Sequence, residues 1–107
     1  MFTRIVECHA KKGKTEEVTK RVRNEVLPIL QKEPGFIDLV ALRDNKDDER
    51  IVCLSFWNSK ENAELHQREH YDTIVQMFRS ELQTNPSLET LQVEISTAHR
   101  IAVGRAA

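Results

Sequence analysis

The most continuously apolar run in the chain reads Ile51-Val52-Cys53-Leu54-Ser55-Phe56-Trp57 and leads directly into Asn58-Ser59-Lys60-Glu61. A short, continuous apolar run is typical of a strand that lies in the centre of a sheet and is buried on both faces. Glu61 stands three residues after Asn58, which is the spacing of a helix capping box with Asn in the place of Ser or Thr. This stretch therefore predicts a central strand that runs directly into a helix.

Three other segments have the composition of strands. Residues 3–10 and 36–43 are rich in β-branched and apolar side chains, and residues 91–97 alternate strictly between apolar and polar types. Pro34-Gly35 is a turn signal immediately before the second of these segments. We therefore expect four strands in all.

Two segments carry apolar residues at helical spacing. The first begins at Thr15, a fair N-cap, and Pro28 is expected to end or kink its last turn. The second runs from Asn58-Ser59 to about Gln83, with a break around Arg68-Glu69, where the apolar content drops. The inward-facing positions are Val18, Val22, Val26 and Ile29 in the first helix, and Ala63, His66, His70, Ile74, Met77, Phe78 and Leu82 in the second.

The order of these elements is strand, helix, strand, strand, helix, strand. It predicts an α+β fold of the ferredoxin-like βαββαβ type, a four-stranded antiparallel sheet with two helices on one face. The first and third strands are expected to pair in the centre of the sheet. A chain of 107 residues has room for one core, so we expect a single domain over residues 1–107.

The face of the sheet that the helices leave uncovered predicts self-association. Strands one to three carry apolar side chains in both directions, so this face would expose a large apolar patch of the kind that marks association surfaces. A second copy packed sheet to sheet would bury the patch with two-fold symmetry, and we therefore expect a homodimer. The tail, residues 98–107, could extend the last strand or cross to the partner, which would place it at the dimer interface.

The bulk composition argues against several classes of protein. The chain holds 16 basic and 17 acidic residues, for a net charge of −1, whereas nucleic-acid binding usually needs a basic surplus. No apolar run approaches the roughly 18–20 residues that cross a bilayer, and the N-terminal residues carry no secretion signal. Cys8 and Cys53 lack metal-ligand spacing and fit reduced, buried thiols. We therefore expect a cytoplasmic protein without nucleic-acid or membrane partners.

Residues 54–66 resemble the antibiotic biosynthesis monooxygenase (ABM) family. In that family a strand ends in a tryptophan, a polar pair caps a helix, and a histidine follows nine residues after the tryptophan. Those features stand here at Trp57, Asn58-Ser59 and His66. Pro34-Gly35-Phe36 is similar to the turn before the family's second strand. The resemblance implies the dimeric α/β-barrel fold.

The resemblance also implies a class of activity. Members of the family include oxygenases that act on phenols or quinols without metal or organic cofactor, haem-degrading enzymes and quinone-related stress proteins. The haem-degrading branch uses an asparagine and a histidine at places that Cys8 and Gln76 hold here, so haem turnover is not expected. What remains is a cofactor-independent monooxygenase for a small phenol- or quinol-like substrate, or a non-catalytic dimer that binds a small hydrophobic molecule or serves in a stress response.

Three residues are the candidate catalytic residues, and each has a structural alternative. Trp57 is either a core aromatic or a pocket wall that holds a flat substrate. His66 is either a structural histidine or a general base with a pKa near neutrality. Tyr71 is either a surface aromatic or a hydrogen-bond donor to a substrate oxygen. We expect their pocket between the helix-covered face of the sheet and the second helix.

The segment His66-Gln67-Arg68-Glu69-His70 also matches H-x-x-E-H, the signature of a zinc metalloprotease class. Two histidines at positions i and i+4 can reach one metal ion, so the match has a physical basis. The chain is far shorter than such proteases, however, and no convincing third ligand follows on a helix. We therefore expect neither a metal nor an organic cofactor.

The homodimer can be tested directly. Light scattering behind a sizing column should give about twice the 12.4 kDa mass of one chain. The physical reason is the apolar face of the sheet, which a lone copy would leave in water. A stable, well-folded monomer at micromolar concentration would contradict the dimer.

Overall fold

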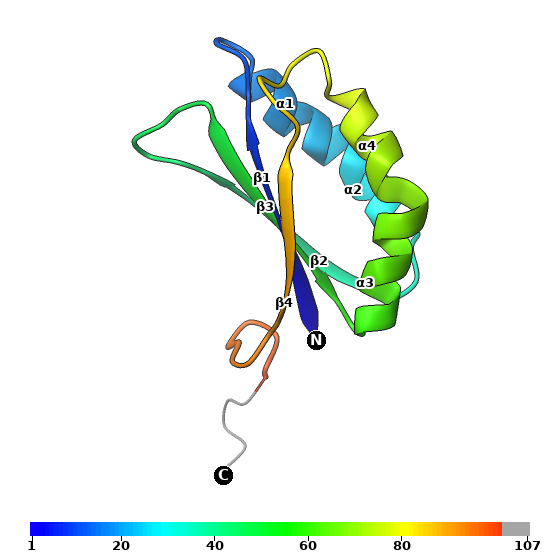
Figure 1. Cartoon of the computed structure of the whole chain (residues 1–107). Coiled ribbons are helices and arrows are strands. Elements are labelled where there is room, and N and C mark those ends of the chain that lie inside the picture. The colour runs from blue at the N-terminus through cyan, green and yellow to red at the C-terminus, as the bar shows by residue number, and fades with distance from the viewer. Residues whose placement is uncertain (102–107) are drawn as a thin grey trace.

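A computed structural model describes residues 1–101 as a four-stranded antiparallel sheet with helices on one face (Figure 1). The strands are β1 Phe2–His9, β2 Phe36–Arg43, β3 Arg50–Trp57 and β4 Ser87–Gln92, in the order β2-β3-β1-β4. The predicted ferredoxin-like α+β architecture is confirmed, together with the central pair of the first and third strands. Residues 102–107, which include the end of the predicted interface tail, lie outside the described residues.

The central strand β3 is held by neighbours on both sides. It pairs with β1 along its whole length, from Phe2 opposite Trp57 to His9 opposite Arg50, and with β2 on its other edge. Its residues Ile51 and Trp57 are almost fully buried under the helices. The long apolar run thus forms the middle of the sheet, as the sequence predicts.

Two helical rods cover one face of the sheet, and each contains a π-helical turn. The first consists of α1 Thr15–Arg21, η1 Val22–Val26 and α2 Leu27–Leu30, and the second of α3 Lys60–His66, η2 Gln67–Tyr71 and α4 Asp72–Met77. Pro28 follows closely on the η1 turn, and the rod ends two residues later at Leu30, so Pro28 stands in the last turn as the sequence predicts. The predicted break at Arg68-Glu69 is the η2 turn, so the rod widens there and continues. None of the helices within residues 1–101 is long and apolar enough to cross a membrane.

The start of each helix differs from its predicted cap. Lys14 stands at the N-cap of α1, and the Thr15 hydroxyl donates to the carbonyl oxygen of Asp48 instead of capping. Ser59 caps α3 by accepting from the Asn62 N–H at 3.2 Å. Asn58 instead accepts from the Asn62 side-chain amide, so the capping position lies one residue later than the spacing suggests.

The predicted bounds of the last helix and the last strand are wrong for one common reason, which is the length of β1. The second rod ends at Met77 and not near Gln83, because the residues after it pair with the end of β1 and its extension at Ala10. Strand β4 spans Ser87–Gln92 and not 91–97, because it starts opposite Glu7 and runs out of partner at the chain start. The remaining alternating residues, 93–97, lie outside the strand.

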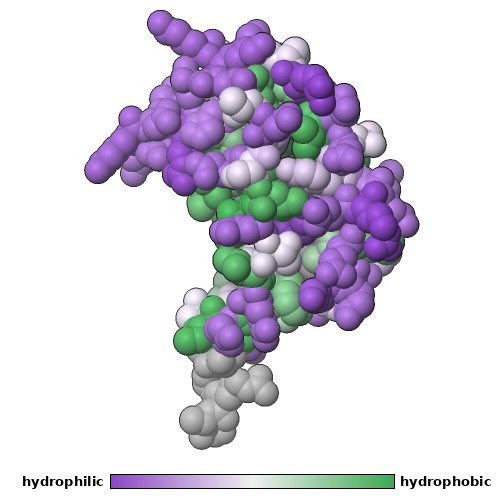
Figure 2. Space-filling model, in the orientation of Figure 1, coloured by the Kyte–Doolittle hydropathy of each residue, from purple (hydrophilic) through white to green (hydrophobic). Residues whose placement is uncertain are grey.

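The face of the sheet away from the helices is apolar along its centre. Ile5, Leu54 and Val40 lie side by side across β1, β3 and β2, and all point to this outer face. Leu42 is 48% exposed, and Leu91 is 47% exposed. Figure 2 shows hydrophobic surface gathered over the sheet, whereas the helical layer is mostly hydrophilic. The outer face is therefore the apolar patch that the alternation of the strands predicts.

The chain after β4 folds back over part of this outer face. Ser96 and Ile101 form an isolated bridge that closes a small loop. From this loop the His99 ring lies against the Phe56 ring, with centroids 4.6 Å apart, and its Nε2 lies 3.1 Å from Asp38 Oδ2. The described part of the predicted interface tail thus lies on the face where the second copy is expected.

The turn before β2 depends on glycine at position 35. Gly35 adopts a φ of +78°, and a Cβ on it would collide with the side chains of Asn58 and Asn62. Its carbonyl oxygen also accepts from the Asn58 N–H at 2.9 Å. This turn therefore packs so closely against the start of α3 that no Cβ fits between them, and only glycine is tolerated at this position.

Gly35→Ala should lower the free energy of unfolding more than Gly13→Ala does. Both glycines have a φ of +78°, but no atom lies within 4 Å of the position of a Gly13 Cβ. The control should cost about 1–2 kcal/mol for its backbone conformation alone. Gly35→Ala should add about 1–3 kcal/mol of steric overlap. Urea unfolding of the three proteins measures both costs, and equal losses for the two variants would contradict the close contact.

Candidate functional site

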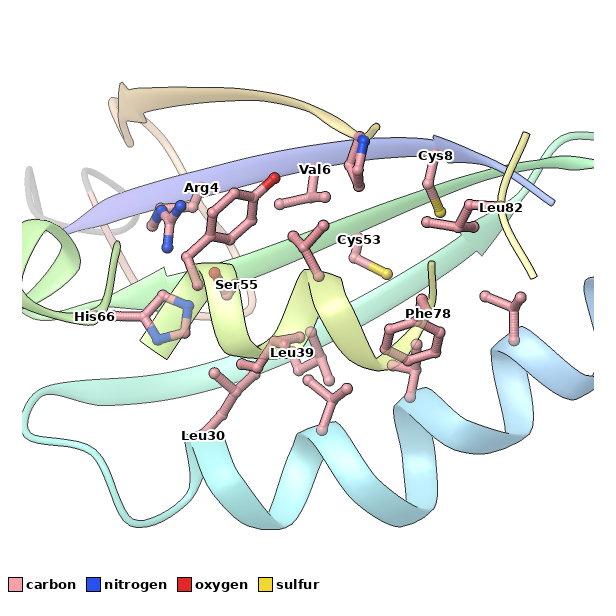
Figure 3. Close-up of a pocket in the computed structure, with 17 residues that line it drawn as sticks. Arg4, Val6, Cys8, Leu30, Leu39, Cys53, Ser55, His66, Phe78 and Leu82 are labelled. Atoms are coloured by element: carbon pink, nitrogen blue, oxygen red, sulfur yellow. The ribbon is translucent and has the colours of Figure 1, made fainter. Parts of the chain in front are cut away.

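A cavity lies between the helix-covered face of the sheet and both helical rods. It holds about 730 Å³ of empty space, part of which is open to solvent, and its lining is almost entirely apolar. Most of the polar lining residues gather near one end, where Figure 3 shows Arg4, Ser55 and His66, while Cys8, Phe78 and Leu82 lie toward the other. A cavity with this lining suits a small apolar molecule with a polar group at one end.

His66 is held at the polar end by a buried carboxylate. It is 5% exposed, and its Nδ1 lies 2.7 Å and 2.9 Å from the two carboxylate oxygens of Glu33. Because Nδ1 faces a carboxylate, it carries the proton in the neutral ring, and Nε2 is the nitrogen left with a lone pair. Burial lowers the pKa of His66 more than the Glu33 carboxylate raises it, so the ring is neutral at pH 7. A neutral histidine with its basic nitrogen free has the state that a general base requires.

Trp57 packs against His66 and does not itself line the cavity. Its ring stacks on the imidazole, with centroids 4.9 Å apart and planes at 27°. It is fully buried, and its indole N–H donates to Ser55 Oγ at 2.9 Å. The structure thus brings Trp57 and His66 together as predicted, but Trp57 is a support for the His66 ring rather than a wall of the cavity.

Tyr71 lines the cavity near His66 because of the η2 turn. Residues five apart in a regular α-helix point about 140° away from each other. The wider π turn, with its i to i+5 hydrogen bonds, brings such residues toward one face. His66 and Tyr71 stand five apart across η2, and both line the cavity. Burial raises the pKa of the Tyr71 hydroxyl, so it stays protonated and can donate a hydrogen bond.

His70 approaches the site from outside the cavity. Its Nε2 lies 3.3 Å from Glu33 Oε1, and its ring centroid is 6.3 Å from that of His66. Glu33 is therefore shared between the two histidines of the H-x-x-E-H match, while Glu69 lies 4.0 Å from His70. Within residues 1–101, no three His, Cys, Asp or Glu side chains are arranged to hold a metal ion.

Both cysteines lie in the wall of the cavity as free thiols. Burial raises the pKa of Cys8 to about 11 and that of Cys53 to about 12. Both are therefore protonated near neutral pH and are poor nucleophiles. They contribute apolar surface to the cavity. Both are half-buried, so the prediction of reduced thiols is confirmed and that of full burial is not.

His9 contacts Glu7 and Asp47 and takes no part in the lining.

Two residues of the site, Glu33 and Arg4, are missing from the sequence prediction. Glu33 stands in the turn before Pro34-Gly35, where an acidic residue looks like part of a solvated loop. Arg4 is 1% exposed and lies over the Tyr71 ring, 5.1 Å from its centroid. The alternation of β1 could have revealed it, because Arg4 shares a strand face with the apolar residue Val6.

The lowered pKa of His66 should make stability fall in mild acid. Above about pH 6.5 neither the folded nor the unfolded chain holds a proton there. Below it the unfolded chain takes up the proton first, so folding becomes less favourable as the pH falls toward the folded pKa. The free energy of unfolding of wild type minus that of His66→Gln should thus be smaller at about pH 5.5 than at about pH 7.5 by urea titration. A difference that grows in acid would contradict the direction of the shift.

Comparison with known proteins agrees with this fold. A Bordetella bronchiseptica structure with the provisional name antibiotic biosynthesis monooxygenase superposes with a TM-score of 0.75 at 12% identity, covering 88% of this chain and 97% of that one. A Nitrosomonas europaea structure with the same provisional name gives 0.70 at 23% identity, with coverages of 89% and 100%. No curated protein matches the chain in sequence. The family model described as antibiotic biosynthesis monooxygenase matches residues 1–77, and the chain therefore belongs to the ABM family.

Proposed function

We propose that the protein is a cofactor-independent monooxygenase that acts on a small phenol- or quinol-like molecule bound in the cavity. The observation that carries this proposal is the buried Glu33–His66 pair at the polar end of an otherwise apolar cavity. A flat, apolar substrate fits the lining, and its hydroxyl group would meet the one neutral imidazole of the lining. Family membership supports the same class of reaction.

In this reaction His66 accepts the phenolic proton, and Glu33 stabilises the imidazolium that forms. The phenolate is electron-rich and reduces O₂ directly, forming a bond between oxygen and a ring carbon ortho or para to the phenolate that carries a hydrogen. The imidazolium returns its proton to the peroxide that results. Loss of water then gives the quinone, so one oxygen atom enters the product and the other leaves as water. The protein supplies a base, an apolar site and positioning, and Tyr71 would donate a hydrogen bond to a substrate oxygen.

The proposed working unit is a homodimer joined through the outer face of the sheet. Ile5, Val40 and Leu54 would leave water on association, and the exposed Leu42 and Leu91 would add to the buried area. The cavity lies on the opposite, helix-covered face. Each copy would therefore keep its own cavity while the sheets pack together.

The second candidate function is binding without catalysis, as in a stress-response protein. The nearly complete apolar lining favours it, since a hydrophobic metabolite could be held by the lining alone. The two functions differ in one observable. Only the oxygenase consumes O₂ when a substrate is added.

His66→Ala should lower turnover by about 10²–10⁴-fold, the usual cost of losing a general base. The assay is O₂ consumption with a panel of hydroquinones and phenols in the presence of a metal chelator. In wild type the rate should rise with pH on an acid limb below about pH 6.5, because His66 must be neutral and burial lowers its pKa. The residual rate of His66→Ala should not show this fall in mild acid, because the variant has no imidazole at this position to be protonated.

Trp57→Phe keeps an aromatic ring on His66 but loses the hydrogen bond to Ser55, so it should reduce the rate less than His66→Ala. Circular dichroism and sizing of each variant show whether the fold and the assembly are retained. Activity that is indifferent to both substitutions would place the chemistry in another part of the molecule. Tight binding of panel members with no O₂ consumption would favour the non-catalytic function.

A further inference from the structure

We propose that Arg4 is a carboxylate-binding residue, and that the cavity takes an apolar aromatic acid whose carboxylate sits on the guanidinium. This inference rests on the proposed function only in using the same cavity, and it names the class of ligand. It starts from an arginine whose Nε and Nη2 have no hydrogen-bond partner among the described residues. An apolar cavity lined by such a pair of charged donors has a defined place for an acceptor.

The guanidinium of Arg4 is buried without partners on one edge. The residue is 1% exposed, and within residues 1–101 neither Nε nor Nη2 has a hydrogen-bond partner. Buried charged donors are normally paired, because removing them from water without compensation is costly. Burial lowers the pKa of Arg4, yet an arginine in a protein remains protonated. These two nitrogen atoms therefore carry N–H donors for which the described residues supply no acceptor.

The acidic group nearest to Arg4 is already engaged. Glu33 raises the pKa of Arg4 by its charge, but its oxygens contact His66 Nδ1 and His70 Nε2. Arg4 Cζ lies over the Tyr71 ring, 5.1 Å from its centroid. The face of an aromatic ring attracts a cation, so Tyr71 helps to hold the guanidinium in place. The open edge of the guanidinium, which carries the unpaired Nε and Nη2, is thus held at the polar end of the cavity before any ligand binds.

The geometry of the open edge selects the chemical class. Nε and Nη2 lie on the same side of the guanidinium and present two parallel N–H bonds. A carboxylate matches this pair with its two oxygens in a bidentate contact, which is stronger and more specific than a single charged hydrogen bond. A phenol or an alcohol offers one oxygen and would leave one donor unpaired. The open edge therefore favours a carboxylate over a single hydroxyl.

The proposed dimer would not supply an acceptor to this edge. Both of its nitrogen atoms are buried, so a carboxylate in the cavity would reach them after a small shift of the neighbouring side chains. Arg4 pairs across the sheet with Ser55, and both residues line the cavity on the helix-covered face. A second copy on the outer face would contact Ile5 and Leu54, which point the other way. The rest of the cavity extends from Arg4 over Val6 and Cys8, so an aromatic body would lie along β1. The ligand class is therefore an aryl carboxylate with a short apolar substituent.

The test compares 4-propylbenzoate with 4-propylbenzamide, which share a body and differ in charge. Isothermal titration of the wild-type protein should show the benzoate binding about 10–100-fold tighter than the benzamide, the range expected of charge-assisted hydrogen bonds. Arg4→Met keeps the bulk of the side chain and removes the donors, so the preference should disappear. Arg23→Met removes an exposed arginine of η1 and should keep the preference.

Equal affinity of wild type for the two molecules, or binding of neither, would overturn the proposal, as would a preference that survives in Arg4→Met. If Arg4→Met does not fold, Arg4→Lys serves instead, because it keeps the charge but loses the two-donor edge. Its preference for the benzoate should fall without vanishing, and an unchanged preference would overturn the proposal. Oxygen consumption is measured separately. An Arg4-dependent preference without O₂ consumption would support this inference and contradict the oxygenase function. O₂ consumption without an Arg4-dependent preference would support the oxygenase function and contradict this inference.

Discussion

A buried contact between a carboxylate and an imidazole connects the parts of the site. Glu33 lies in the turn before β2, and His66 lies at the end of α3, so the contact joins this turn to the second helical rod through side chains far apart in the sequence. Trp57, at the end of β3, packs against the same imidazole. The His66 ring is therefore the point of contact between three elements, which are the end of β3, the turn before β2 and the second rod. Burial keeps the His66 ring neutral although Glu33 raises its pKa, and the Glu33 carboxylate fixes the remaining proton on Nδ1.

The two ends of the cavity differ in the polarity of the side chains that line them. At the polar end, His66 and Tyr71 are brought to the same wall, and Arg4 lies beside them. At the other end, apolar side chains and the protonated thiols of Cys8 and Cys53 exclude water. A charge or hydrogen bond at the polar end acts in a medium of low dielectric constant, where such interactions are stronger than in water. The apolar lining therefore strengthens the few polar groups that it surrounds.

Much of the fold could be predicted from local patterns, and the site only in part. The run from Ile51 to Trp57 and the turn at Pro34-Gly35 encode their elements within a few residues, so β3 and β2 were predicted almost to the residue. The end of β4 could not be predicted this way, since it depends on where β1 runs out of partners. Glu33 was missed for a related reason, because its role comes from contacts with residues far along the chain. Arg4 was missed although it shares a strand face with Val6, since β1 carries apolar residues on both faces and the linear pattern does not say which face the helices cover.

The π turn in the second rod has a consequence for how this protein can change. A π turn holds one residue more than the α-helical turn it replaces, so a single deletion within residues 67–71 would restore a regular helix without shortening the rod by a full turn. The residues after the deletion would keep nearly the same orientation, because the π turn had absorbed the extra residue. Tyr71 would then stand four residues after His66, and residues four apart lie on one face of an α-helix, so it would stay in the cavity wall. The π turn is therefore a place where the length of the chain can change while the wall of the cavity is kept.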